Sequence, residues 1–214
     1  MSRITAVRTG RKTGKRVNIF LDSRFAFSLE AEVVVKQGLR VGQELSEDQV
    51  AALARTEHHD RCLSAATRFL TYRPRSESEL RERLYKRGFG EDGIEVAIAR
   101  LKNQGFVDDI AFARFWKENR DSFSPRSQWL TGLELKKKGV SADVINEVVR
   151  DTDDGDSAYR AALDKAHRLP LSDYEIFRRR LGEFLKRRGF SYDVISRTVR
   201  RLWQELKTEG QAEA

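Results

Sequence analysis

The chain has 214 residues, with 41 Lys and Arg against 33 Asp and Glu, which gives a formal net charge of +8. A hydrophobic share of 39% and a charged share of 35% exclude one large buried core and favour small modules with much surface per residue. The longest apolar run, from Val50 to Ala54, is too short to cross a bilayer, and the basic start lacks the apolar stretch of a secretory signal. A single cysteine, Cys62, cannot form an internal disulfide, so we expect a cytoplasmic protein.

The first residues predict a small β-meander. Three segments rich in Val, Ile and Phe, at residues 4–7, 17–21 and 25–29, are separated by polar turns. The turn at residues 10–16 has two glycines too close together for a phosphate-binding loop, and Arg16 stands where such a loop needs Ser or Thr. We therefore expect a hairpin with a basic tip that either contacts phosphates or is a solvated edge. The basic residues of this tip are Arg11, Lys12 and Lys15.

Two helices are expected next. The first covers about residues 30–37 and ends at Gly38, a residue suited to the left-handed conformation that closes a helix. The second begins at a capping box formed by Ser46 and Gln49 and continues through Leu53.

From about residue 60 onward the sequence repeats itself three times. Segments 84–94, 135–145 and 185–195 align without a gap. Each segment predicts the end of one helix, then a glycine suited to positive φ, and then a new helix with apolar residues at every fourth position. A further helix is expected upstream of each pair, which predicts tandem three-helix repeats of roughly 50 residues. The coinciding glycines are Gly88, Gly139 and Gly189.

The expected fold class is mainly α: three tandem three-helix repeats in an elongated array behind a small β-containing N-terminal region. The upstream helices are placed at residues 62–70, 109–120 and 157–168. Pro125 is assigned to the first turn of a helix, and residues 151–156 to a hinge. The expected domain boundaries are 1–58, 59–106, 107–153 and 154–214.

Residues for catalysis or metal binding are few. His58 and His59 project about 100° apart on a helix and make a poor chelating pair, and the third histidine is His167. Cys62 lies on the apolar side of its helix and is expected to be a buried core residue. With no triad, nucleotide loop or metal set, we expect no enzymatic activity, no cofactor and no metal.

Basic residues cluster before each repeat glycine. Compensation of the helix dipole explains one or two charges per helix, whereas three matched clusters exceed that need. Along an array they would form a basic stripe able to follow a polyanion or a periodic protein surface. The alternative is that the charge only keeps the protein soluble. The candidate binding residues are Lys86, Arg87, Lys136, Lys137, Lys138, Arg178, Arg179, Lys186, Arg187 and Arg188, with Arg11, Lys12 and Lys15 of the hairpin tip.

Several stretches resemble the RecX family of recombination regulators. The clearest are Tyr-Arg-Pro-Arg-Ser-Glu-Ser-Glu-Leu at residues 72–80 and Gly-Phe-Val-Asp-Asp-Ile-Ala-Phe-Ala-Arg-Phe-Trp at residues 105–116. Residues 16–22 and 38–42 resemble the segment that precedes the repeats in that family. Two departures are that Thr131 replaces a leucine of the other repeats and that the third repeat lacks the Arg-Pro-Arg sequence.

The resemblance implies a regulator of RecA, mainly an inhibitor, that binds the groove of the RecA–DNA filament. It would suppress ATP hydrolysis and strand exchange in recombinational DNA repair and the SOS response. The implied partners are the RecA nucleoprotein filament and, weakly, single- and double-stranded DNA, for a monomer that does not bind membranes. The alternative is a helical-repeat protein that binds DNA directly, without RecA.

Overall fold

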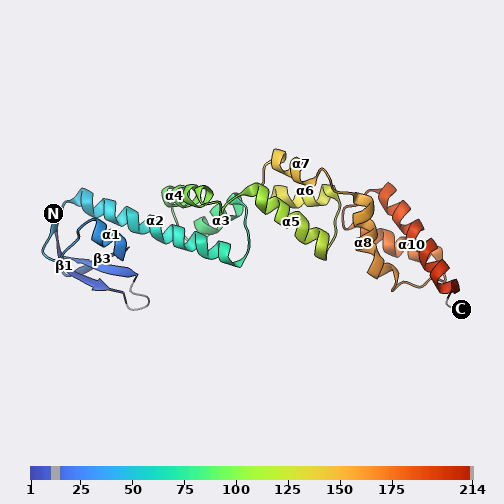
Figure 1. The fold of residues 1–214 in the computed structure, drawn as a ribbon, viewed down its shortest axis with the longest axis horizontal. Coiled ribbons are helices and arrows are strands. Elements are labelled where there is room, and N and C mark those ends of the chain that lie inside the picture. Colours follow the sequence, from blue (N-terminus) through green and yellow to red (C-terminus); the bar gives the residue numbers. More distant parts are fainter. Residues whose placement is uncertain (11–14, 213–214) are drawn as a thin grey trace. The chain divides into compact units, whose positions relative to one another are not determined.

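The computed structural model describes residues 1–10 and 15–212 (Figure 1). The chain divides into two compact units, the first made of residues 1–73 and 81–106 and the second of residues 74–80 and 107 onward. The described residues form ten helices and one sheet near the N-terminus, which confirms the predicted fold class. None of these helices combines the length and the apolar character needed to span a membrane.

The N-terminal sheet has four antiparallel strands in the order β3-β2-β1-β4. The predicted meander is confirmed, and β4, which has only two residues, was not predicted. Between β2 and β3 the chain turns at Asp22 and Ser23, whose φ values of 45° and 65° are those of a tight hairpin turn. The strands are β1 Ser2–Thr9, β2 Arg16–Leu21, β3 Arg24–Glu30 and β4 Glu44–Leu45.

Two helices follow the meander in the first unit. Helix α1, Ala31–Lys36, ends as predicted before Gly38, whose φ is +60°. Helix α2, Glu47–Tyr72, begins at the predicted capping box and is one continuous helix. The sequence had suggested two separate helices here, which is wrong. No glycine or proline interrupts α2. The helix has two partners: through Leu53 it joins the core of the sheet, and it also packs against α4.

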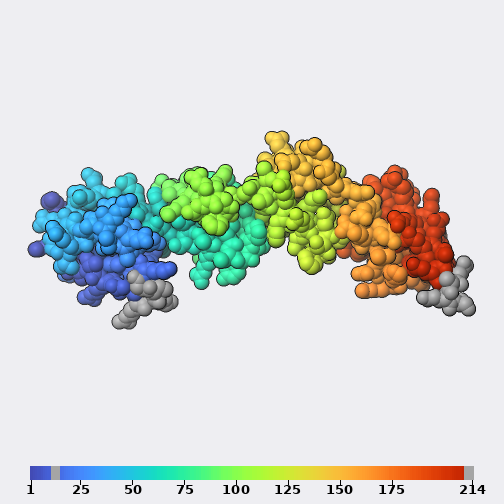
Figure 2. Space-filling model, in the orientation of Figure 1, coloured from blue at the N-terminus to red at the C-terminus, as the bar shows by residue number. Residues whose placement is uncertain are grey.

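The remaining helices follow the threefold pattern. Gly88, Gly139 and Gly189 have φ values of +82°, +75° and +85°, which confirms their predicted position after a helix end. Helices α5, α6 and α7 pack on one another, as do α8, α9 and α10, and in the space-filling view α8 and α10 form one continuous surface (Figure 2). The helices are α3 Glu77–Lys86, α4 Glu91–Asn103, α5 Asp109–Phe123, α6 Gln128–Lys137, α7 Ala142–Val149, α8 Asp154–Ala166, α9 Tyr174–Lys186 and α10 Tyr192–Ala212.

Each of the last two repeats has its own small core. In the second repeat Phe112 of α5 packs with Leu135 of α6 and Val149 of α7. In the third repeat α9 contributes Phe177, Leu181 and Leu185, which meet alanines of α8 and the apolar side of α10. A core of this size suits a module of about three helices, in agreement with the low hydrophobic share of the chain.

Two predictions about helix ends differ from the structure in their bounds. Pro125 is not in the first turn of α6, because Ser127 is the N-cap of that helix and its hydroxyl accepts from the Leu130 N–H at 3.1 Å. The expected hinge contains the start of α8, where Asp153 accepts from the N–H of Gly155 at 2.7 Å. Carboxylates stabilise a helix N-terminus, so an acidic run begins a helix there. The four domain boundaries and the elongated arrangement stay predictions.

Candidate binding surface

The last basic residue of each repeat cluster lies over an aromatic ring. This position directly precedes the repeat glycine, so the three residues are equivalent in the alignment of the repeats. Cations in this position gain from the negative face of the ring, and their side chains cover apolar surface. The packing gives these residues a structural role that the sequence did not reveal. The pairs are Arg87 over Phe69 at 4.8 Å, Lys138 over Trp116 at 5.4 Å and Arg188 over Phe184 at 4.5 Å from the ring centroid.

The two preceding positions differ between the repeats. In the second and third repeats both hold exposed cations, and within the described part of the chain none of the four has a carboxylate within 4.0 Å. In the first repeat these positions hold Tyr85 and Lys86, and the lysine is paired with Glu82. At these two positions of the described clusters, the exposed cations without a carboxylate within 4.0 Å are therefore in the last two repeats. The four residues, called here the free cations, are Lys136, Lys137, Lys186 and Arg187.

The other candidate residues have varied surroundings. Arg178 is held by Glu175, whose carboxylate accepts from Nε at 3.1 Å and from Nη2 at 2.7 Å, whereas Arg179 is exposed on the same helix. Lys15 at the base of the hairpin is exposed. Arg11 and Lys12 lie outside the described residues. A binding role for any of these stays a prediction.

The repeat glycines also form the contacts between repeats in the second unit. The Ser76 hydroxyl donates to the Lys138 carbonyl, and the Ser127 N–H donates to the Arg188 carbonyl at 3.1 Å. A Cβ on Gly139 would come within 3.0 Å of the Ser78 side chain, and a Cβ on Gly189 would lie 2.6 Å from the Leu130 Cβ. The start of α3 thus contacts the glycine that follows α6, and the start of α6 contacts the glycine that follows α9.

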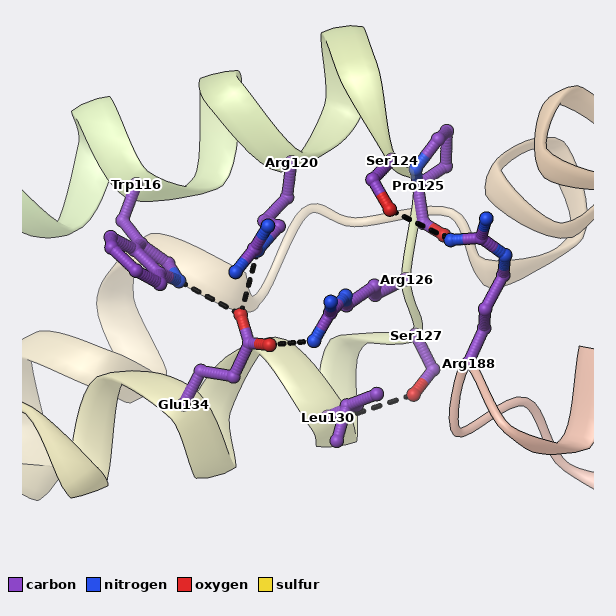
Figure 3. A network of polar contacts seen from close by, with 9 residues as sticks. All are labelled: Trp116, Arg120, Ser124, Pro125, Arg126, Ser127, Leu130, Glu134 and Arg188. Atoms are coloured by element: carbon purple, nitrogen blue, oxygen red, sulfur yellow. Dashed lines mark hydrogen bonds and ion pairs between the residues drawn. The ribbon is translucent and has the colours of Figure 1, made fainter.

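A network of polar contacts surrounds Glu134 beside the second of these junctions (Figure 3). The carboxylate, with only 14% of its side chain exposed, accepts from Trp116 Nε1 at 2.9 Å and from Arg120 Nε at 2.8 Å, and also from Arg126. Sequence reasoning missed Glu134, whose only signal is a lone carboxylate between Leu133 and Leu135. One acid therefore holds two guanidinium groups and an indole together.

Arg188 extends this network into the third repeat. Its Nη1 donates to the Ser124 hydroxyl at 2.8 Å and to the Pro125 carbonyl at 3.5 Å (Figure 3). Burial lowers the pKa of Arg188 and of Arg126, and for Arg126 the nearby charges of Arg120 and Arg188 lower it further. Arg188 is therefore part of the repeat junction.

A comparable pair lies at the first junction. Arg75 Nη1 donates to Glu79 Oε1 at 2.6 Å, and Glu79 Oε2 lies 3.7 Å from Lys138 Nζ. Arg75 and Arg126 both precede the N-cap serine of their helix, so the second arginine of the Arg-Pro-Arg sequence and its counterpart in the second repeat belong to the junctions. In the third repeat Leu171 and Ser172 precede the N-cap Asp173. The arginine that belongs to the junctions in the other two repeats is therefore absent at the start of this helix.

The histidines and the cysteine have ordinary structural surroundings. His59 Nε2 lies 2.7 Å from Asp92 Oδ2, and the His58 ring packs edge-on against Phe89. Cys62 is fully buried, as predicted, and burial raises the pKa of its thiol to about 11. Within residues 1–10 and 15–212, no three His, Cys, Asp or Glu side chains are placed to hold a metal ion.

Comparisons with known proteins agree with this architecture. Family descriptions match as "Regulatory protein RecX N-terminal domain" at residues 2–46, "RecX, first three-helix domain" at residues 62–101 and "RecX, third three-helix domain" at residues 153–199. A "Regulatory protein RecX" of Clostridium botulinum (strain Eklund 17B / Type B) is 30% identical over 205 residues, covering 94% of this chain and 96% of that protein. The chain belongs to the RecX family.

Other RecX proteins are similarly related. The "Regulatory protein RecX" of Bacillus velezensis is 30% identical and covers 99% of this chain and 81% of its own length. A solved "Crystal structure of regulatory protein RecX" has a TM-score of 0.69 at 23% identity, over 92% of this chain and 98% of that one. RecX from Lactobacillus salivarius has a TM-score of 0.59 at 22% identity, over 68% of this chain and 96% of its own. These two structures share the fold, and the resemblance stated from the sequence is confirmed.

Proposed function

We propose that this RecX-family protein binds the RecA filament on single-stranded DNA and restrains RecA, mainly as an inhibitor of ATP hydrolysis and strand exchange in recombinational repair. Support comes from relatives named "Regulatory protein RecX", which match nearly the whole chain. The groove of the filament is the proposed binding site, because a chain of repeated modules can contact successive subunits of a periodic partner.

The free cations carry the proposal. Two adjacent cations occupy the same helix end in the second and third repeats, without a carboxylate partner among the described residues. Their positions repeat with the modules, as a partner with repeated acidic surfaces requires. Each contact can be weak, because linked contacts combine through effective concentration and raise the affinity 10²–10⁴-fold, an order-of-magnitude range.

Restraint follows from binding without any chemical step on this chain. A ligand that contacts several subunits at once stabilises the filament state whose spacing it fits, and disfavours states that need a different spacing. ATP hydrolysis and strand exchange both require the filament to change, so we expect both to slow. The size of the effect is set by the difference in affinity between the filament states.

A direct DNA-binding protein is the second candidate, and the free cations also favour it, because exposed lysine and arginine side chains bind phosphates. The two proposals differ in where affinity is lost. For filament recognition, removal of the free cations weakens binding to RecA-coated DNA more than binding to naked DNA. For direct DNA binding, both fall in parallel.

The test replaces all four free cations with glutamine and measures RecA ATP hydrolysis on single-stranded DNA. A matched control replaces four other exposed cations, which keeps the change in net charge equal. We expect the first variant to fold and to lose inhibition by about 10²-fold or more, and the control to inhibit like the parent. Equal inhibition by both variants would contradict the proposed site. The control positions are Lys36, Arg40, Arg150 and Arg200.

A further inference from the structure

A groove lies between α9 and α10 on the third repeat. Its volume is about 630 Å³, a size typical of ligand-binding pockets. Its apolar lining includes Phe190, Ile195 and Val199, and its basic lining includes Arg179 and Lys186. The groove therefore combines an apolar floor with a charged rim in the repeat that also carries two free cations.

Three residues that line the groove differ from their counterparts in the first repeat. Gly182 of α9 has no side chain, and a Cβ there would be in van der Waals contact with Ile195 at 3.7 Å. Across the groove on α10 are Ser196 and Tyr192, and the Tyr192 side chain is 80% exposed. Among the described residues, no hydrogen bond or ion pair joins α9 to α10 across the groove at Gly182 and Ser196.

The first repeat closes the equivalent gap with an ion pair. Arg81 of α3 is the counterpart of Gly182, and it reaches α4, where its Nη1 and Nη2 donate to the two carboxylate oxygens of Glu95 at 2.5 and 3.0 Å. Glu95 is the counterpart of Ser196, so both partners of this bridge are missing in the third repeat. The same helix pair is bridged in one repeat and open in the other.

We propose that the groove binds an acidic protein segment that carries a bulky apolar side chain. Arg179 and Lys186 are exposed on the rim, and among the described residues neither has a carboxylate within 4.0 Å. The apolar side chain enters the floor while acidic neighbours meet these two cations. The inference rests on the proposed function in one respect, since the segment is taken to belong to the protein of the filament.

A protein segment fits the lining better than nucleic acid does. Glu175 and Glu183 also line the groove and would repel a continuous row of phosphates. The Tyr174 ring is packed edge-on against Trp203 at 5.2 Å, which limits its use for stacking on a base. A peptide with separated charges avoids the two glutamates and uses the aliphatic floor.

The direct test uses a blocked peptide of Asp, Glu and Gly with two central phenylalanines, and a second peptide in which serines replace them. Binding to the full chain is followed by amide shifts in NMR spectra. We expect shifts confined to α9 and α10 and an affinity on the order of ten-fold higher for the first peptide, because it buries an aromatic side chain. Equal affinities of the two peptides, or no binding, would overturn the proposal.

Two variants locate the site. Gly182→Arg with Ser196→Glu transplants the bridge of the first repeat and keeps the net charge, and Arg179→Gln with Lys186→Gln removes the rim charge without entering the floor. We expect each to lose peptide binding by about ten-fold or more. Arg180→Gln with Arg200→Gln changes charge outside the groove on the same two helices and should bind the peptide like the parent. A folded bridge variant that binds the peptide as tightly as the parent would refute the groove site.

Filament binding separates this inference from the proposed function. If the parent binds the RecA filament and the bridge variant binds more weakly while naked DNA binding is kept, the groove holds a protein segment of the filament. A parallel loss on naked DNA would mean that nucleic acid occupies the groove, against the proposal. If the parent does not bind the filament yet binds the peptide in the groove, the proposed function fails and the acidic-segment site stands.

Discussion

Replacing each of the three repeat glycines with alanine distinguishes two roles of glycine: the adoption of positive φ and the close approach of a neighbouring helix. All three glycines have positive φ, which costs a residue with a Cβ roughly 1–2 kcal/mol. No atom of the described residues lies within 4 Å of a Cβ built on Gly88, so Gly88→Ala loses only this amount. At Gly139 and Gly189 the Cβ would also collide with Ser78 and Leu130 of the preceding repeat, and such overpacking adds about 1–3 kcal/mol. We expect losses of about 2–5 kcal/mol for Gly139→Ala and Gly189→Ala.

Urea unfolding followed by far-UV circular dichroism, with tryptophan fluorescence as a second signal, measures these losses. Trp116 and Trp129 belong to the second repeat, which takes part in both junctions, so their signal reports on the contacts under test. Asparagine tolerates positive φ better than alanine, so Gly88→Asn should recover most of the stability, whereas Gly139→Asn should not. Equal losses for the three alanine variants would refute the close-approach role of Gly139 and Gly189.

Three further predictions concern Glu134, Cys62 and the basic residues of the hairpin tip. Glu134→Gln leaves Arg120 and Arg126 without their shared carboxylate, and since both are about a quarter exposed we expect a loss on the order of 2–3 kcal/mol, below that of a fully buried pair. Glu147→Gln at the exposed pair with Arg114 is the control, and an equal shift in thermal midpoint would contradict a structural network. Cys62→Ser should cost about 1–3 kcal/mol and leave inhibition intact. Because burial raises the thiol pKa from 9.0 to about 11, stability should also fall as the pH rises from about 9 to 11, and the serine variant should lack this decline. Replacing Arg11, Lys12 and Lys15 with glutamine should flatten the dependence of log affinity on log salt by up to about 3, and an unchanged slope would make the hairpin tip a solvated turn.

Local signals predicted the parts of the fold that depend on neighbouring residues. The capping box at Ser46 and the positive φ of the repeat glycines are set by short-range chemistry, so the sequence reveals them. The start of α8 had the same kind of signal, since Asp153 is followed by two acidic residues of the first turn, but the run was interpreted as a hinge.

Contacts between distant segments could not be predicted in this way. The length of α2 depends on its packing against the sheet and against α4, and the polar residues between Leu53 and Cys62 gave no sign of continuity. The partners of Lys138 and Arg188 could not be predicted, because their aromatic and polar contacts come from other turns and helices. Glu134 was overlooked because its three donors lie 8–18 residues away in the chain. The repeat alignment predicted which positions are equivalent, and the structure identified which of them face solvent.

The most direct measurement compares binding of the intact chain to RecA-coated and to naked single-stranded DNA of the same length at moderate salt. Fluorescence anisotropy of the labelled protein gives both affinities, and the variant without the four free cations is measured beside the parent. We expect the parent to bind the RecA filament more tightly than naked DNA, and the variant to lose more affinity for the filament than for naked DNA. Equal affinities of the parent for coated and naked DNA, with parallel losses in the variant, would contradict filament recognition and leave a protein that binds DNA alone.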